Sequence, residues 1–73
     1  MKLTFVRPYE NSRRRVAEHE GWRYELVYNG PQDWSAVTYG PSRRAPTFLA
    51  RDLKTMAAAR ATCIQHASAE LAS

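Results

Sequence analysis

Two runs of alternating side chains, joined by a turn, constrain the fold of this chain more than any other feature. In "WRYELVY", residues 22–28, every second residue is aromatic or leucine, so an extended strand would have one apolar face. "NGPQD" follows with the Asn-Gly pair of a tight turn, and "WSAVTYG" then has the pattern of a returning strand. We therefore predict a β-hairpin over residues 22–40.

The hairpin pattern also indicates a register. If Tyr28 lies opposite Trp34, then Leu26 lies opposite Ala36, and the aromatic side chains stay on one face. The small side chain of Ala36 would leave room for a helix to approach that face. The opposite face would carry Arg23, Glu25, Val27, Ser35, Val37 and Tyr39. A shift of one residue would exchange the two faces, so the register determines which side chains are buried.

The last third of the chain has the composition of a helix. Residues 47–72 are rich in alanine and contain neither glycine nor proline, which predicts one long helix with Thr47 as its N-cap. At about 100° per residue an apolar stripe forms from Leu49, Leu53, Met56, Ala57, Ile64, Ala67 and Leu71. This stripe would pack on the aromatic face of the hairpin. Arg60 falls within it, and would either extend its head into water or be held for a carboxylate or a ligand.

The remaining segments complete one α+β domain. Apolar and other side chains alternate in "KLTFVR", which predicts a short strand over residues 1–9 that Pro8 ends. Residues 10–21 would form a basic segment that is irregular or a short helix, and residues 41–46 would form a loop. The predicted fold is a small antiparallel sheet of about three strands packed against one long C-terminal helix.

Composition narrows the class of protein. Over 73 residues the chain is 44% hydrophobic and 25% charged, which is typical of a globular domain. A single cysteine, Cys63, excludes an internal disulfide. The N-terminal residues lack the apolar run of a signal peptide, and no stretch approaches the roughly 18 apolar residues of a membrane span. We expect a cytoplasmic protein that does not associate with membranes.

The motifs of common enzymes and metal sites are not found in the sequence. The serines lie in no nucleophile-elbow context, and the three glycines are too far apart for a phosphate-binding loop. Cys63, His66 and Glu70 would share one flank of the helix, but they supply at most three ligands and no second cluster completes a tetrahedral site. We therefore predict a protein that is not an enzyme and that holds no cofactor or metal.

Clustered arginines are the strongest functional signal. The formal net charge is +4, and the sequence pI is about 9.7. Arg13, Arg14 and Arg15 could contact successive phosphates if their segment follows a nucleic-acid backbone, and Arg43 and Arg44 lie in a second predicted loop. Arginine suits this role because its planar guanidinium binds phosphate or guanine in a bidentate manner.

The hairpin face away from the helix offers two further candidates. Arg23 and Tyr39 would be cross-strand neighbours there, and could contact a nucleic-acid groove or another protein. The alternative is a solvent-exposed face with one cation–π pair. Glu25, at the centre of this face, would repel phosphate and therefore favours a partner other than a groove.

The order of elements resembles that of two families of nucleic-acid-binding domains. "GWRYELVYNG" and "WSAVTYG" ahead of "TFLARDLKTMAAARA" resemble the arm-type DNA-binding domains of phage and transposon integrases, and are similar to the β-β-β-α part of double-stranded-RNA-binding domains. The resemblance covers residues 22–71 and implies a sheet face that enters a groove, with Arg23 and Tyr39 at contact positions. Glu25 departs from that pattern. Small phage or prophage accessory proteins, including anti-CRISPR inhibitors, have a similar size and a similar pattern of aromatic strands and alanine-rich helix.

Two hypotheses of function follow from the sequence. The first is a small non-enzymatic protein of the phage or mobile-element type, which contacts nucleic acid or a nucleoprotein complex through its arginines. The alternative is a protein-binding inhibitor or adaptor, anti-CRISPR-like, which docks on an acidic protein surface through the exposed sheet face and the arginine loops. Either protein would act as a monomer or a weak homodimer. Both hypotheses stay open because either partner would use the same arginines.

Overall fold

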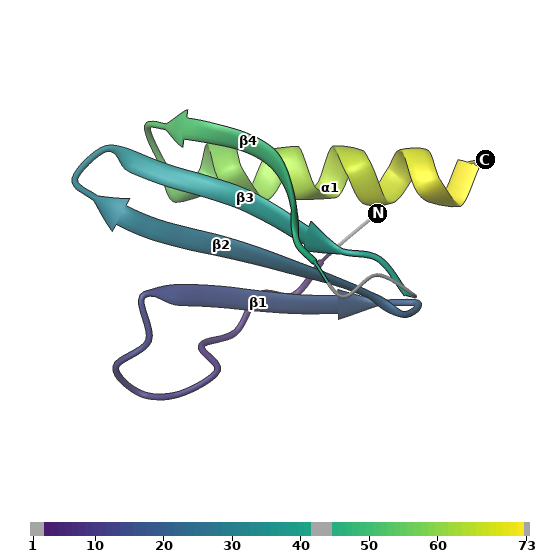
Figure 1. Ribbon diagram of the computed structural model, residues 1–73, viewed down its shortest axis with the longest axis horizontal. Helices are drawn as coiled ribbons and strands as arrows, with labels where there is room; N and C mark the ends of the chain where they lie inside the picture. The colour runs from purple at the N-terminus through teal and green to yellow at the C-terminus, as the bar shows by residue number, and fades with distance from the viewer. Residues whose placement is uncertain (1–2, 42–44, 73) are drawn as a thin grey trace.

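The chain folds into a four-stranded antiparallel sheet with one C-terminal helix across it (Figure 1). The computed structural model describes residues 3–41 and 45–72, with side chains through residue 70. The elements are β1 (Arg14–His19), β2 (Trp22–Gly30), β3 (Asp33–Tyr39), β4 (Thr47–Leu53) and α1 (Met56–Ala72). The strand order is β1-β2-β3-β4. The predicted α+β class is confirmed, with four strands in place of about three.

The β2–β3 hairpin has the predicted register. Tyr28 pairs with Trp34 and Leu26 pairs with Ala36. The turn between the strands contains Pro31 and Gln32, and Gln32 adopts a positive φ of 56°. The hairpin prediction over residues 22–40 is therefore confirmed, including the assignment of the aromatic side chains to one face.

The core lies between that face and α1. Tyr24 and Leu26 of β2 are each 1% exposed and belong to one cluster with Ala59, Cys63 and Ala67 of the helix. These three helical residues are spaced by four, so they form a narrow stripe of small side chains that allows the helix to approach the sheet closely.

The helical stripe differs in part from the predicted one. Ala57 is exposed, and Ile64 is only partly buried against the core. Arg60 is exposed, so its guanidinium lies in water and does not occupy the helix–sheet interface. The predicted member Leu71 has its side chain outside the described part. Within that part, no helix combines the length and the apolarity that crossing a membrane requires.

The prediction of a helix over residues 47–72 was wrong for its first third. Thr47–Leu53 forms the edge strand β4, which pairs with β3. Thr and Phe favour extended backbone, and Asp52 adopts a left-handed φ of 58° that interrupts any continuous helix. The helix begins only at Met56, where the hydroxyl of Thr55 accepts the N–H of Ala58 at 3.1 Å and caps it.

The N-terminal predictions also need correction. Within the described part of residues 1–9 there is no regular strand, and Val6 makes a single bridge to Val16. Residues 14–19, expected to be irregular or helical, form β1 instead. A tight turn with positive φ at Glu20 and Gly21 returns the chain into β2, so β1 gains a full ladder of hydrogen bonds. Pairing with β2 thus determines the conformation of a segment whose own pattern is weak.

Candidate functional site

The three consecutive arginines lie on different sides of the sheet. Arg14 is opposite Val27, whereas Arg15 is opposite Leu26, whose side chain is in the core. Successive residues of a strand point to opposite faces, so Arg15 lies on the helix side and Arg14 on the other side, which we call the open face. Arg13 directly precedes β1. The arginines therefore do not form one continuous row.

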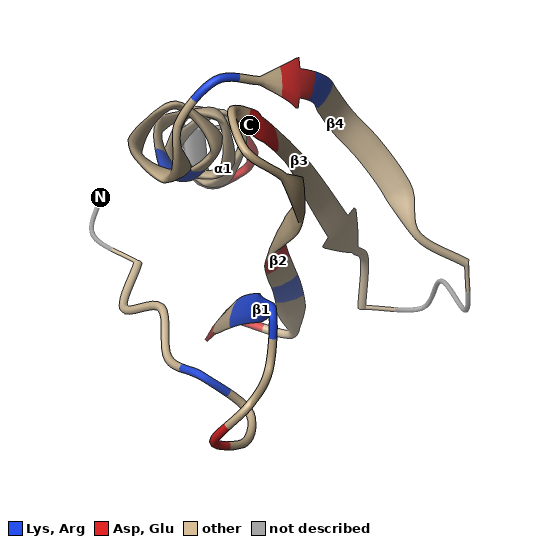
Figure 2. Cartoon of the chain, turned by 90° about the vertical axis from the view of Figure 1, so that its left-hand side faces the viewer, with Lys and Arg blue, Asp and Glu red and all other residues tan. Residues whose placement is uncertain are grey.

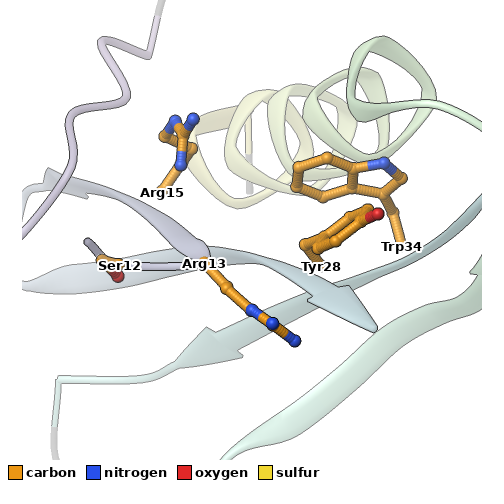
Figure 3. Close-up of a pocket in the computed structure, with 5 residues that line it drawn as sticks. All are labelled: Ser12, Arg13, Arg15, Tyr28 and Trp34. Atoms are coloured by element: carbon orange, nitrogen blue, oxygen red, sulfur yellow. The ribbon is translucent and has the colours of Figure 1, made fainter. Parts of the chain in front are cut away.

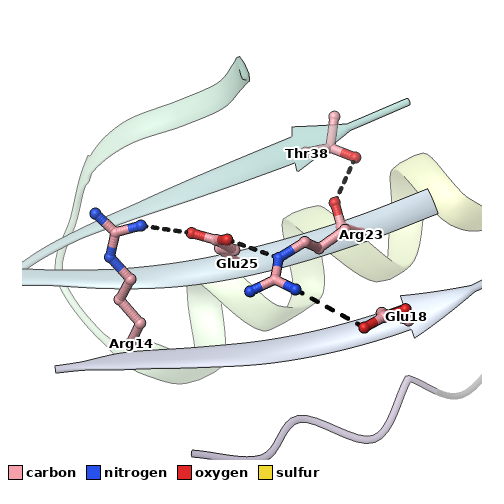
Figure 4. A network of polar contacts seen from close by, with 5 residues as sticks. All are labelled: Arg14, Glu18, Arg23, Glu25 and Thr38. Carbon is pink, nitrogen blue, oxygen red and sulfur yellow. Dashed lines mark hydrogen bonds and ion pairs between the residues drawn. The ribbon is translucent and has the colours of Figure 1, made fainter. Parts of the chain in front are cut away.

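On the open face, a buried carboxylate binds two arginines (Figure 4). The Glu25 side chain is 6% exposed, and it accepts from Arg14 Nη1 at 2.8 Å and from Arg23 Nε at 2.9 Å. Arg23 also lies 3.8 Å from the carboxylate of Glu18. Two positive and two negative charges therefore cancel within these four residues, which we call the Glu25 cluster. The two arginines provide partners for the Glu25 carboxylate, whose burial without them would cost much free energy.

The rest of the open face is largely apolar. Tyr39 pairs with Arg23 across the hairpin, as predicted. Phe48 of β4 is 48% exposed and helps to line a shallow hollow of about 170 Å³ together with Val37 and Tyr39. Arg51 stacks over the Phe48 ring at 3.9 Å. This face therefore presents aromatic surface and a neutralised charge cluster.

A second hollow lies on the helix side, at the end of the sheet where β1 begins. Figure 3 shows its two parts, with the arginines on the β1 segment and two rings on the β2–β3 hairpin. Its lining residues are Ser12, Arg13, Arg15, Tyr28 and Trp34, and its volume is about 260 Å³. We call it the arginine–aromatic hollow. The Tyr28 and Trp34 rings lie 5.1 Å apart and are tilted by 57°.

The hollow carries uncompensated positive charge. Among the residues that the structure describes, no carboxylate lies within ion-pairing distance of Arg13 or Arg15. Arg15 Nη1 donates to the carbonyl oxygen of Arg14 at 3.2 Å, which orients the guanidinium and leaves its other N–H groups available. In Figure 2 the blue of Lys and Arg on β1 lies apart from the blue on β4 and α1. The hollow thus combines two cations with partly exposed aromatic rings.

The structure groups two of the predicted site residues with two residues that were not predicted as site residues. It brings Arg13 and Arg15 together with Tyr28 and Trp34, which the sequence pattern had indicated only as core residues. The signal that could have found the rings is their place beside the turn, at the end of the predicted hairpin. The remaining predicted candidates, Arg43 and Arg44, lie outside the described residues.

A polar cluster also joins the sheet to α1. The hydroxyl of Tyr24 lies 3.0 Å from His66 Nδ1, and His66 Nε2 lies 3.7 Å from Glu70. Burial, and then the charges of Cys63 and Glu70, raise the pKa of Tyr24 above its ordinary value of 10.0. Burial also raises the pKa of the Cys63 thiol to about 12, so this group is neutral at pH 7.

The buried, neutral Cys63 thiol is therefore suited to packing and not to nucleophilic chemistry. In the described part of the chain, no three His, Cys, Asp or Glu residues are grouped so that they could hold a metal ion. Comparison of the chain with protein-family models, with curated proteins and with solved structures found no match.

Proposed function

We propose that this protein is a non-enzymatic nucleic-acid-binding module whose contact site is the arginine–aromatic hollow. One observation carries the proposal: Arg13 and Arg15, which have no carboxylate partner among the described residues, share a hollow with the rings of Tyr28 and Trp34. Guanidinium groups bind phosphate through charge-assisted hydrogen bonds, and aromatic faces bind bases. A nucleic acid is the common ligand that offers both groups together, either free or within a nucleoprotein complex.

The charges of Arg14 and Arg23 support this location. Arg14 and Arg23 already bind Glu25, and a phosphate that displaced this carboxylate would leave it buried without a partner. The net charge of +4 attracts a polyanion toward the whole molecule. Close contact is then expected where a phosphate meets a cation without displacing a carboxylate, and Arg13 and Arg15 meet that condition.

The salt dependence of binding tests the proposal. Fluorescence anisotropy of labelled single strands and duplexes, titrated between about 50 and 200 mM salt, measures the number of phosphates neutralised. We expect the double variant Arg13→Ala/Arg15→Ala to weaken binding and to flatten the slope of log K against log salt by roughly 1.4 for single strands or 1.8 for duplexes.

Arg51→Ala is the matched control, because it removes one charge on the opposite edge strand, β4. It should weaken binding much less than Arg15→Ala does. Failure of every nucleic acid to bind at about 50 mM salt would exclude the proposed function. Equal losses in the Arg15 and Arg51 variants would exclude this location.

A second candidate function rests on the open face. The exposed Phe48 ring and the hollow beside it favour contact with an apolar patch on another protein, with the arginines at the rim. In this case the protein would be an inhibitor or adaptor of a host complex. Phe48→Ser discriminates between the two functions, because it should leave nucleic-acid binding unchanged and should remove binding to such a protein.

A further inference from the structure

We infer that the arginine–aromatic hollow accepts one unpaired nucleobase, so that the protein prefers single-stranded to duplex nucleic acid. This inference rests on the function proposed above, and specifies the class of ligand. It follows from the size of the hollow, the geometry of the two rings and the placement of the two arginines.

The hollow has room for a small planar group. Its volume of about 260 Å³ lies just below the roughly 300–1,000 Å³ of sites for drug-sized ligands. The rings of Tyr28 and Trp34 are in contact and tilted by 57°, so a base cannot slide between them. It would stack instead on the free face of one ring, as bases do on aromatic side chains of single-strand-binding proteins.

A paired base cannot make this contact. In a duplex the faces of each base are covered by its neighbours in the stack, and removing one base from the stack costs a few kcal/mol. A single strand exposes base faces at lower cost. A site that binds a base by stacking therefore selects for unpaired bases.

The arginines are positioned for the phosphates that flank such a base. Arg13 and Arg15 are two residues apart, which corresponds to roughly 6–7 Å along an extended chain. Arg13 is exposed at the rim, whereas Arg15 is half-buried beside the rings. The pair can therefore contact phosphates on both sides of one nucleotide while its base rests on a ring.

The walls of the hollow are held in place before any ligand binds. The N–H of Tyr28 donates to the carbonyl of Arg13 at 3.1 Å, and the hydroxyl of Ser12 accepts the N–H of Arg14 at 3.0 Å. Trp34 packs partly against the core. This ordered backbone lowers the conformational entropy that the lining residues lose on binding.

Tryptophan fluorescence tests the inference directly. The chain has two tryptophans, so Trp22→Phe leaves Trp34 as the single reporter. We expect single-stranded DNA or RNA of about ten nucleotides to quench Trp34. We also expect the single strand to bind at least about tenfold more tightly than the duplex of the same sequence. The DNA and RNA arms show which sugar the site prefers, and quenching by either one supports the inference.

A matched pair of tyrosine variants provides a second readout. Tyr28→Leu should weaken single-strand binding by about 5- to 150-fold, the range expected for loss of one base–aromatic stack. Tyr39→Leu makes the same chemical change on the open face and should leave the affinity within about twofold. Thermal melting of both variants establishes that they are folded, and anisotropy with the wild-type tryptophans avoids dependence on the Trp22 variant.

The outcomes separate this inference from the proposed function. Equal affinity for duplex and single strand, with Trp34 unquenched and a continued requirement for Arg13 and Arg15, would overturn the inference and leave the function standing. Equal losses in Tyr28→Leu and Tyr39→Leu would also overturn it. Failure to bind any nucleic acid would overturn both.

Discussion

The two faces of the sheet bury neighbouring residues of one strand by different means. On the helix side, Leu26 is 1% exposed because α1 covers it, and on the open face Glu25 is 4% exposed although α1 lies on the other side of the sheet. There the side chains of Arg14 and Arg23 approach the carboxylate from both sides. Long arginine side chains can therefore shield part of a sheet, but their charges are then neutralised by the group that they shield.

This difference bears on where the protein can bind an anion. The alternation of β1 directs Arg14 to the neutralised face and Arg15 to the arginine–aromatic hollow. Adjacent residues of one type thus have different electrostatic surroundings. The sequence clusters three arginines, but the expected contribution of each to binding depends on which face receives it.

The largest expected effect comes from opening the helix-covered face. Leu26→Ala should lower the free energy of unfolding by about 2–5 kcal/mol, because it removes buried methyl groups and leaves a cavity beneath α1. Val27→Ala, on the open face of the same strand, should cost less, since Val27 is only partly buried. Urea denaturation measures both, and equal costs would contradict the assignment of the core to the helix side.

Removing the central charge of the open face should have a smaller effect. Glu25→Gln should lower the free energy of unfolding by about 1–2 kcal/mol, because two charge-assisted hydrogen bonds weaken. The cost stays below that of a fully buried pair because Arg14 is 54% exposed and can be solvated.

Glu25→Gln should also strengthen nucleic-acid binding, with a steeper salt dependence, because Arg14 and Arg23 become available. Glu18→Gln is the control for the loss of stability, since that carboxylate is 74% exposed and lies 3.8 Å from Arg23. A loss of stability in the Glu18 variant equal to that in the Glu25 variant would show that burial of Glu25 contributes nothing.

Alkaline pH should lower the free energy of unfolding by about 1 kcal/mol per pH unit, through a thiol buried on the helix-covered face. Burial raises the pKa of Cys63 from 9.0 to about 12, so the unfolded thiol ionises within this window while the folded thiol stays neutral. The free energy of unfolding should therefore be unaffected by this group below pH 9, and should fall as the pH rises from 9 toward 12. The raised pKa of Tyr24 acts in the same direction above pH 10.

Melting temperatures at pH 7, 9 and 10 measure this dependence. Cys63→Ala lowers stability at every pH through lost packing, but the decline between pH 9 and 10 should be shallower than in the wild type. Parallel declines in the two proteins would show that the Cys63 thiol is accessible to solvent.

The hairpin and its register were predictable because their information is local. Tyr28 and Trp34 flank a turn with its own sequence signal, and alternation then determines the faces. The strand β4 was not predictable in the same way, since Leu49 and Leu53 are spaced by four and match a helical stripe equally well. The left-handed conformation of Asp52 and pairing with β3 decide between the two structures.

The candidate site was only half predictable for a similar reason. The arginine cluster is evident in the sequence, and Arg13 and Arg15 remain candidates. Their separation from Arg14 depends on β1, whose segment has no clear alternation of apolar residues and is extended because it pairs with β2. Without that strand, the sequence could not show that Arg15 and Trp34 line the same hollow.

The most direct test of the central claim compares two neighbouring residues, Arg14 and Arg15. Single substitutions to alanine remove the same charge one residue apart, and the salt dependence of single-strand binding is then measured for each. We expect Arg15→Ala to weaken binding and to flatten the slope by about 0.7, the value for one phosphate contact, while Arg14→Ala changes the slope little. Equal losses in both variants would contradict the claim that the two faces of the sheet differ in their availability to an anion.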